Sequence, residues 1–308
     1  MKTATKKAKK EPRLVRTCGA MQVHHRLLEM YPQFRFRLAA LEDATKRRLA
    51  SGAAGRTGLI TIPVVVHVVY KTAAENISDA QVKSQIAALN RDYSAANTDK
   101  TKCPTVWKGL VTNAQVQFAL ATKDPNNKAT TGITRTHTTK SSFGDDDSVK
   151  KKSQGGVKAW DSKKYLNLWV CTLGDNLLGY AQFPGGPAAT DGVVILNRAF
   201  GTNGTATAPF NLGRTTTHEV GHWLNLRHIW GDTEDCSGTD FVADTPNAQH
   251  PNFGKPTFPH ISCTNGPNGD MFVNYMDYVD DDTMVMFSAG QVARMRSALD
   301  GPRSTIGA

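Results

Sequence analysis

A stretch near the middle of the second half of the chain, TTTHEVGHWLNLRHIWGD, concentrates residues that can bind a metal and move a proton. His218 and His222 are four residues apart, so on a helix they project from one face and can share one ion. Imidazole nitrogen is a good zinc ligand. Glu219 lies about 100° further round the helix, where it would flank the ion and hold a metal-bound water as general base. The spacing therefore indicates zinc-dependent hydrolysis.

His228 can join the same ion only if the helix stops before it. It follows His222 by six residues, which on a continued helix is about 240° away, nearly the opposite face. In the pattern HExxHxxGxxH a glycine makes the turn, because glycine adopts a positive φ freely. Asn225 stands at that position here, and asparagine is the next most tolerant residue. We therefore expect a left-handed Asn225 and a third ligand at His228.

Simpler interpretations exist for these residues. Taken singly, each histidine could be an ordinary surface or core residue, and the ion could be structural. The joint spacing around a helix-breaking residue argues against the first interpretation, and three histidines without a fourth protein ligand nearby favour an open catalytic position. The alternative function is a non-catalytic, zinc-stabilised protein-binding module. Such a protein would usually lose the glutamate, whereas Glu219 is present.

Apolar patterns predict the elements that position this cluster. LITIPVVVHVVY is a nearly unbroken β-branched run, typical of a buried strand. SDAQVKSQIAALNRDY predicts a helix, because Ser78 and Gln81 match a capping box ahead of an apolar face. Further strands are expected at 114–121, 165–171 and 192–197, and helices at 21–49 (in two pieces around Pro32), from Thr215 and from Ser288. The order β-α-β-β-β-α indicates an α/β domain.

Charge separates the N-terminal segment from the rest of the chain. Residues 1–56 hold 14 Lys/Arg and 4 Asp/Glu, whereas residues 57–308 hold 23 of each, so the first segment carries the whole net charge of +10. Nucleic-acid binding requires a basic face on the folded domain, and the balanced remainder disfavours it. No apolar run is long enough to span a bilayer, so no membrane partner is expected. The basic start lacks the apolar region of a signal peptide.

Longer segments resemble a known family. HEVGHWLNLRHIWGD and VNYMDYVDDD together are similar to the metzincin metalloproteases, and within them to the pappalysin family; YLNLWVCTLGDNLLGYAQFPGG, DGVVILNRAFGT and FSAGQVARMR extend the resemblance. It implies an α/β fold with a mixed, mostly parallel twisted sheet. An inhibitory prosegment would occupy 1–56, an upper catalytic subdomain 57–228, and an irregular lower subdomain 229–308. The implied activity is that of a secreted zinc endopeptidase acting on proteins or peptides.

The resemblance also assigns roles around the zinc. Met276 would form a methionine turn beneath the ion, and the Tyr278 phenol would stabilise the oxyanion. An aspartate just after this turn would lie at the base of the S1′ pocket and favour Lys or Arg at P1′. Asp282 is the best match within Asp280–Asp282, with solvated loop charges as the alternative. The substrate would lie antiparallel to a rim strand near 192–197.

Structural and regulatory roles follow from the same resemblance. Cys236 and Cys263 would form a disulfide, and Asp240 and Thr245 would contribute to a calcium site. The chain has five cysteines, so at least one thiol has no intrachain disulfide partner.

Cys18, within RTCGA, would be that thiol, because in the family's latent enzymes a thiolate occupies the fourth zinc position. The alternative is a surface thiol in a disordered tail. The Gly-rich stretch 51–58 predicts a flexible linker, and we expect activating cleavage, by the enzyme itself or another protease, at the Gly55–Arg56 bond.

Overall fold

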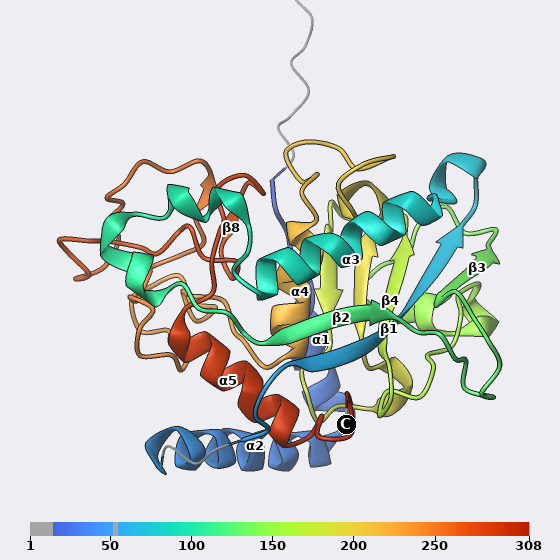
Figure 1. Cartoon of the computed structure of the whole chain (residues 1–308), viewed down its shortest axis with the longest axis horizontal. Coiled ribbons are helices and arrows are strands. Elements are labelled where there is room, and N and C mark those ends of the chain that lie inside the picture. The colour runs from blue at the N-terminus through green and yellow to red at the C-terminus, as the bar shows by residue number, and fades with distance from the viewer. Residues whose placement is uncertain (1–14, 52–54, 308) are drawn as a thin grey trace, which may run out of the picture.

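A six-stranded, mostly parallel sheet forms the centre of the molecule (Figure 1). The computed structural model describes residues 15–51 and 55–307. Strand order is β2-β1-β4-β6-β5, with β3 also pairing with β1, and only β5 runs antiparallel to its neighbour. The strands are β1 Ile60–Tyr70, β2 Val116–Leu120, β3 Ile133–His137, β4 Leu166–Cys171, β5 Gly179–Ala181 and β6 Val193–Leu196. The expected mixed, mostly parallel α/β fold is confirmed.

The long apolar strand β1 organises this sheet. Its first half pairs with β2, its second half with β3, and its middle with β4 on the other side. Val64 and Val66 on one face and Val65 and Val69 on the other are at most 1% exposed, as expected for a strand covered on both faces.

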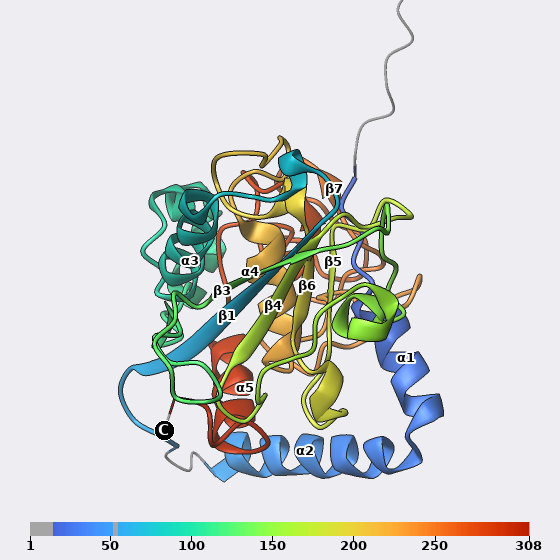
Figure 2. The ribbon, with the colours of Figure 1, turned by 90° about the vertical axis from the view of Figure 1, so that its right-hand side faces the viewer.

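Helices cover the sheet on both sides (Figures 1 and 2). The helix α3 contacts both β2 and α4, while α1 packs against β5 and α2 runs along α5. Pro32 begins α2, where its missing N–H costs nothing. The bounds are α1 Ala20–Met30, α2 Pro32–Ser51, α3 Asp79–Tyr93, α4 Arg214–Trp223 and α5 Ala289–Asp300. Within the described residues, no helix is both long and apolar enough to cross a membrane.

Two strands of the six-stranded sheet were not predicted, and one was expected at the wrong place in it. The strand β3 reads ITRTH and β5 only GYA, so neither has a clear apolar alternation. The rim strand expected near 192–197 is β6, which lies inside the sheet between β4 and β5. That expectation is wrong, because the short antiparallel strand β5 takes the edge.

The region between α4 and α5 is largely irregular. It contains the paired short strands β7 (Phe253–Gly254) and β8 (Tyr278–Val279). Cys236 and Cys263 form a disulfide with a Cα–Cα distance of 5.9 Å. This region places Met276 and Tyr278 beneath and beside the histidines.

Candidate metal centre and active site

The end of α4 makes the turn that the third histidine requires. The Asn225 N–H donates to the His222 carbonyl at 2.9 Å, and the Leu226 N–H donates to the Gly221 carbonyl at 2.9 Å. This pair of bonds is a Schellman motif, which needs a left-handed residue between helix and exit. Asn225 has φ +74°, as predicted. The chain then returns His228 to the face that carries the other two histidines.

The three imidazoles converge on one point. Their Nε2 atoms lie 3.1–3.3 Å from one another. The Nδ1 atoms of His218 and His222 are 2.8 Å from the carbonyl oxygens of Tyr275 and Leu226. The Nδ1 of His228 contacts the Asp232 carboxylate. Each Nδ1 therefore carries the proton, and the three Nε2 lone pairs face inward.

This donor set fits zinc. Three nitrogens about 2.0–2.1 Å from a tetrahedral ion would lie about 3.3 Å apart, close to the separation found here. All three rings are buried. Burial, followed by repulsion from the neighbouring imidazoles, lowers the pKa of His218 and His222 well below 6.5. The rings of His218 and His222 are therefore held neutral, the form that binds a metal. Asp232, which the sequence reasoning missed, fixes the third ring; its i+4 spacing from His228 was the available signal.

Cys18 completes the set of possible ligands. Its Sγ and the three histidine nitrogens all lie within 4.8 Å of one another. The thiol donates to the Glu219 carboxylate at 3.3 Å. Burial raises the pKa of Glu219 to about 8, and burial and the Glu219 charge raise that of Cys18. A dication among the histidines would favour the charged form of both groups.

Met276 and Tyr278 both lie next to the zinc-binding motif, Met276 against Gly221 and Tyr278 beside His228. Met276 is fully buried, and a Cβ added to Gly221 would meet its sulfur at 2.5 Å. The glycine between the two helical histidines therefore admits the methionine beneath them. The Tyr278 ring lies 5.0 Å from the His228 ring, and its hydroxyl donates to the Cys18 carbonyl at 3.4 Å.

The segment around Cys18 adds to the edge of the sheet. The Gly19 N–H donates to the Gly179 carbonyl at 2.9 Å, and the Leu178 N–H donates to the Thr17 carbonyl at 3.1 Å. This pairing is parallel to β5. These backbone hydrogen bonds at the edge strand β5 hold Cys18 over the histidines.

Arg16, two residues before Cys18, lies in a buried acidic pocket. Its guanidinium is 2.6 Å from the Asp281 carboxylate and 3.1 Å from the Thr215 hydroxyl, and both charged side chains are at most 1% exposed. The other Asp281 oxygen accepts from the backbone N–H groups of Leu212 at 2.8 Å and Arg214 at 3.3 Å. Asp281 is therefore fixed at the start of α4 with one oxygen facing the guanidinium.

Asp282, the residue that the sequence predicts at the base of the S1′ pocket, does not pair with Arg16. Its side chain is 42% exposed and pairs with Lys255, and its carbonyl accepts from Lys102 at 2.9 Å. Consecutive residues in this loop point in different directions, and backbone donors near α4 select Asp281. The carboxylate that contacts Arg16 is therefore Asp281, one residue before Asp282.

The residues assigned to calcium lie together. The Asp240 carboxylate accepts from the Thr245 hydroxyl at 2.7 Å and from the Val242 N–H at 3.0 Å. Burial raises the pKa of Asp240 to about 7. The four residues at the zinc centre are the one group of three or more His, Cys, Asp or Glu suited to a metal within 15–51 and 55–307. Calcium binding stays a prediction.

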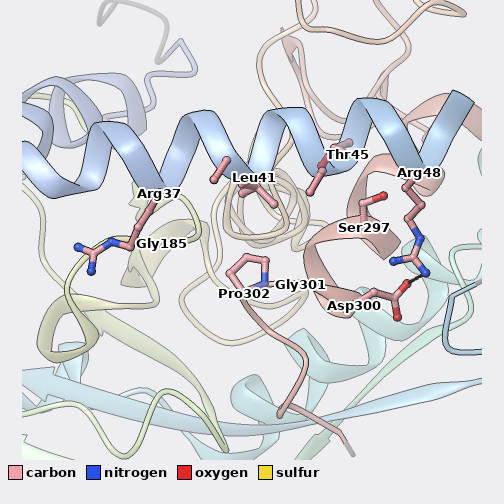
Figure 3. A pocket seen from close by; sticks show the side chains of 11 residues that line it. Arg37, Leu41, Thr45, Arg48, Gly185, Ser297, Asp300, Gly301 and Pro302 are labelled. Carbon is pink, nitrogen blue, oxygen red and sulfur yellow. Dashed lines mark ion pairs between the residues drawn. The ribbon is translucent and has the colours of Figure 1, made fainter.

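The expected cleavage point lies against α5. The Arg56 N–H donates to Asp300 at 2.9 Å, and its guanidinium donates to the carbonyls of Leu299 and Ile306. Arg48 of α2 pairs with the same Asp300 at 2.8 Å, at the end of a pocket between α2 and α5 (Figure 3). A Cβ at Gly55 would come within 2.0 Å of that carboxylate, so a larger residue there would displace the Asp300 and Arg48 side chains.

Comparisons with known proteins agree with this site. The peptidase family described as pregnancy-associated plasma protein-A matches residues 149–300. An extracellular metalloprotease of Arthroderma otae is 32% identical over 92% of this chain and 90% of its own length, and one of Verticillium alfalfae is 35% identical over 82% and 80%.

Solved structures are also similar over most of the chain. A promirolysin mutant of Tannerella forsythia is 47% identical, with a TM-score of 0.87 over 94% of this chain and 96% of that one. Mature mirolysin of the same organism, in complex with a cleaved peptide, is 52% identical, with a TM-score of 0.79 over 81% and 96%.

A mostly parallel sheet packed against a helix with two histidines, a turn that leads to a third histidine, and a buried methionine beneath them form the architecture of the metzincin zinc metalloproteases. Fold and site assign the chain to that class. The family match and the 32% identity to the Arthroderma otae metalloprotease over 92% of this chain identify the family within this class. The chain belongs to the pappalysin family and is a metalloendopeptidase.

Proposed function

We propose that this protein is a secreted zinc endopeptidase that is made latent, cleaves before Arg or Lys, and is activated by removal of residues 1–55. The observation that carries the proposal is the pair of contacts made by Cys18 and Arg16, one at the metal ligands and one at Asp281. Secretion is supported by the disulfide and by relatives named extracellular metalloproteases.

The chain's own residues divide the chemistry between them. His218, His222 and His228 would hold the zinc, which when bound supplies Lewis-acid activation of water and of the scissile carbonyl. The Glu219 carboxylate takes a proton from the attacking water and passes it to the leaving amine as the C–N bond breaks. The Tyr278 hydroxyl, displaced from the Cys18 carbonyl when that segment leaves, donates to the developing charge on the carbonyl oxygen.

The preference for a basic P1′ residue rests on Asp281. It is supported by Arg16 of the N-terminal segment, whose guanidinium contacts Asp281 and also donates to the Thr215 hydroxyl and the Val279 carbonyl. The segment around Cys18 runs parallel to β5. A substrate bound antiparallel to β5 would therefore run in the opposite direction to this segment. The P1′ residue of the substrate would then reach Asp281 in place of Arg16. Because the segment around Cys18 runs in the opposite direction to a substrate, it would itself be cleaved poorly.

Activation would require two separate parts of the N-terminal segment to leave. Cys18 must withdraw from the metal ligands, and α2 must separate from α5. Arg56 must also detach from Asp300 before a second enzyme molecule can bind it at P1′. Cleavage at Gly55–Arg56 is supported by the smaller share of this chain that mature mirolysin matches, compared with promirolysin. Bound calcium at Asp240 and Thr245 would stabilise the loop beside the centre.

The test is incubation of the purified full chain with a casein-like substrate, with and without a zinc chelator. Mass spectrometry of the products and of the protein's own N-terminus gives the cleaved bonds. We expect chelator-sensitive cleavage before Arg or Lys and a new N-terminus at Arg56. Chelator-insensitive activity would contradict the zinc chemistry, and cleavage at unrelated residues would contradict the role of Asp281.

A further inference from the structure

A partly buried cationic site lies beside the turn that ends α4. Arg227, Arg294 and Phe241 form it, and we call it the arginine recess. Both guanidinium carbons lie 5.4 Å from the centre of the Phe241 ring. The Arg294 side chain is 1% exposed, and its Nε donates to the Asn225 carbonyl at 2.7 Å. Two like charges are therefore held close together around one aromatic ring.

A carboxylate of the N-terminal segment fills this recess. Glu42 of α2 forms an ion pair with Arg294 and accepts from the Asn225 side-chain amide at 3.3 Å. Its charge also acts favourably on Arg227. Among the described residues, the Arg227 Nε and the second Glu42 oxygen are buried without a hydrogen-bond partner. The recess is thus shaped around an anion and retains unused donor capacity.

Removal of the segment would leave the two arginines without that anion. Asp232 and Asp240 lie close enough for their charges to act favourably on Arg227 and Arg294, but neither carboxylate forms an ion pair with them. Asp232 contacts His228, and Asp240 accepts from Thr245 and Val242. Phe241 is 41% exposed and Arg227 is half-buried even with α2 in place. In the processed enzyme the recess would therefore be accessible and would have lost Glu42, the one carboxylate that forms an ion pair with either arginine among the described residues.

The recess lies on the side of the metal centre away from Asp281. The Phe183 ring is 5.3 Å from the ring of His222, and the Arg227 guanidinium lies 5.6 Å from the same Phe183 ring. His24 of α1, six residues after Cys18, also contacts Phe183 at 4.9 Å. The chain after Cys18 therefore leads toward the recess, whereas Arg16 before it leads to Asp281. A substrate that runs opposite to the segment around Cys18 would therefore place its residues upstream of the cleaved bond on the side of the arginine recess.

We propose that, once the segment is removed, the arginine recess binds an acidic side chain of the polypeptide substrate upstream of the cleaved bond. Glu42 occupies the place of that side chain in the latent protein. The inference rests on the proposed function, because it uses the substrate direction that places P1′ at Asp281. It adds a second specificity element, in which a guanidinium pair recognises Glu or Asp.

The test uses processed enzyme obtained from the full chain and quenched fluorogenic peptides with Arg at P1′. Each upstream position carries Glu or Gln in turn, and kcat/KM is measured at low and high salt. We expect Glu to be favoured over Gln by about threefold to tenfold at one position, and less at high salt. Arg227→Gln should remove this preference, and Arg227→Lys should retain part of it.

A matched control removes a charge elsewhere. Arg91→Gln on α3 also replaces a half-buried arginine and should keep the Glu preference. Zinc content and melting temperature of each variant are measured alongside. Equal cleavage of Glu and Gln peptides by the unaltered enzyme overturns the inference, as does a preference that survives in Arg227→Gln, and the proposed function then still stands. If no peptide with Arg at P1′ is cleaved, the proposed function fails too.

Discussion

Replacing Asp281 by Asn should remove most of the preference for Arg at P1′. In Asn the single oxygen is needed for the backbone N–H groups of Leu212 and Arg214, so its amide nitrogen would face the incoming guanidinium. The bond lost is a buried, charge-assisted contact of 2.6 Å in the latent chain. Such a bond contributes about 1.5–3 kcal/mol, so kcat/KM for Arg peptides should fall about 10- to 100-fold.

The neighbouring residue supplies the matched control. Asp282→Asn removes the same charge from an exposed pair with Lys255, which is worth about 0.2–1 kcal/mol at most. Kinetics on two peptides with Arg or Leu at P1′ separate the variants, because the Leu peptide should be cleaved no worse by Asp281→Asn. The reasoning is refuted if Asp282→Asn loses the Arg preference while Asp281→Asn keeps it.

Three further predictions concern latency, the ligand turn and calcium. Cys18→Ser in the full chain should lose the thiolate ligand, so intact zymogen should turn over a fluorogenic peptide faster; unchanged latency would argue against the switch. Asn225→Gly should keep zinc, whereas Asn225→Val at φ +74° should cost about 1–2 kcal/mol and reduce zinc content, as thermal unfolding and metal analysis would show. Burial raises the pKa of Asp240 to about 7, above its unfolded value, so the calcium-free protein should lose stability as pH rises toward 7. Asp240→Asn should flatten that dependence and abolish any calcium-induced rise in Tm at pH 8; a rise that persists would place calcium elsewhere.

Features governed by local geometry were predictable from the sequence. The i, i+4 histidines, the left-handed Asn225 and the long buried strand follow from helix periodicity and apolar runs. The edge strand β5 was not predictable, because its three residues are too few to show an apolar alternation. It is a strand because it forms hydrogen bonds with β6, a contact that the local sequence does not indicate.

Long-range contacts set the remaining details of the site. Three consecutive aspartates look alike in sequence, and backbone donors some seventy residues away decide that the second one faces inward. The contact between Arg16 and Asp281 joins residues at opposite ends of the chain and has no local signal. The division into 1–56, 57–228 and 229–308 stays a prediction.

The central claim is that Glu219 carries out proton transfer at a three-histidine zinc centre. The most direct measurement is the cleavage rate of an Arg-P1′ peptide by processed Glu219→Ala, with Glu234→Ala as an exposed control and zinc content determined for both. Processing with an added protease separates maturation from catalysis. We predict bound zinc in both variants, activity close to the unaltered enzyme for Glu234→Ala, and loss of nearly all activity for Glu219→Ala. Undiminished cleavage by zinc-loaded Glu219→Ala would contradict the account.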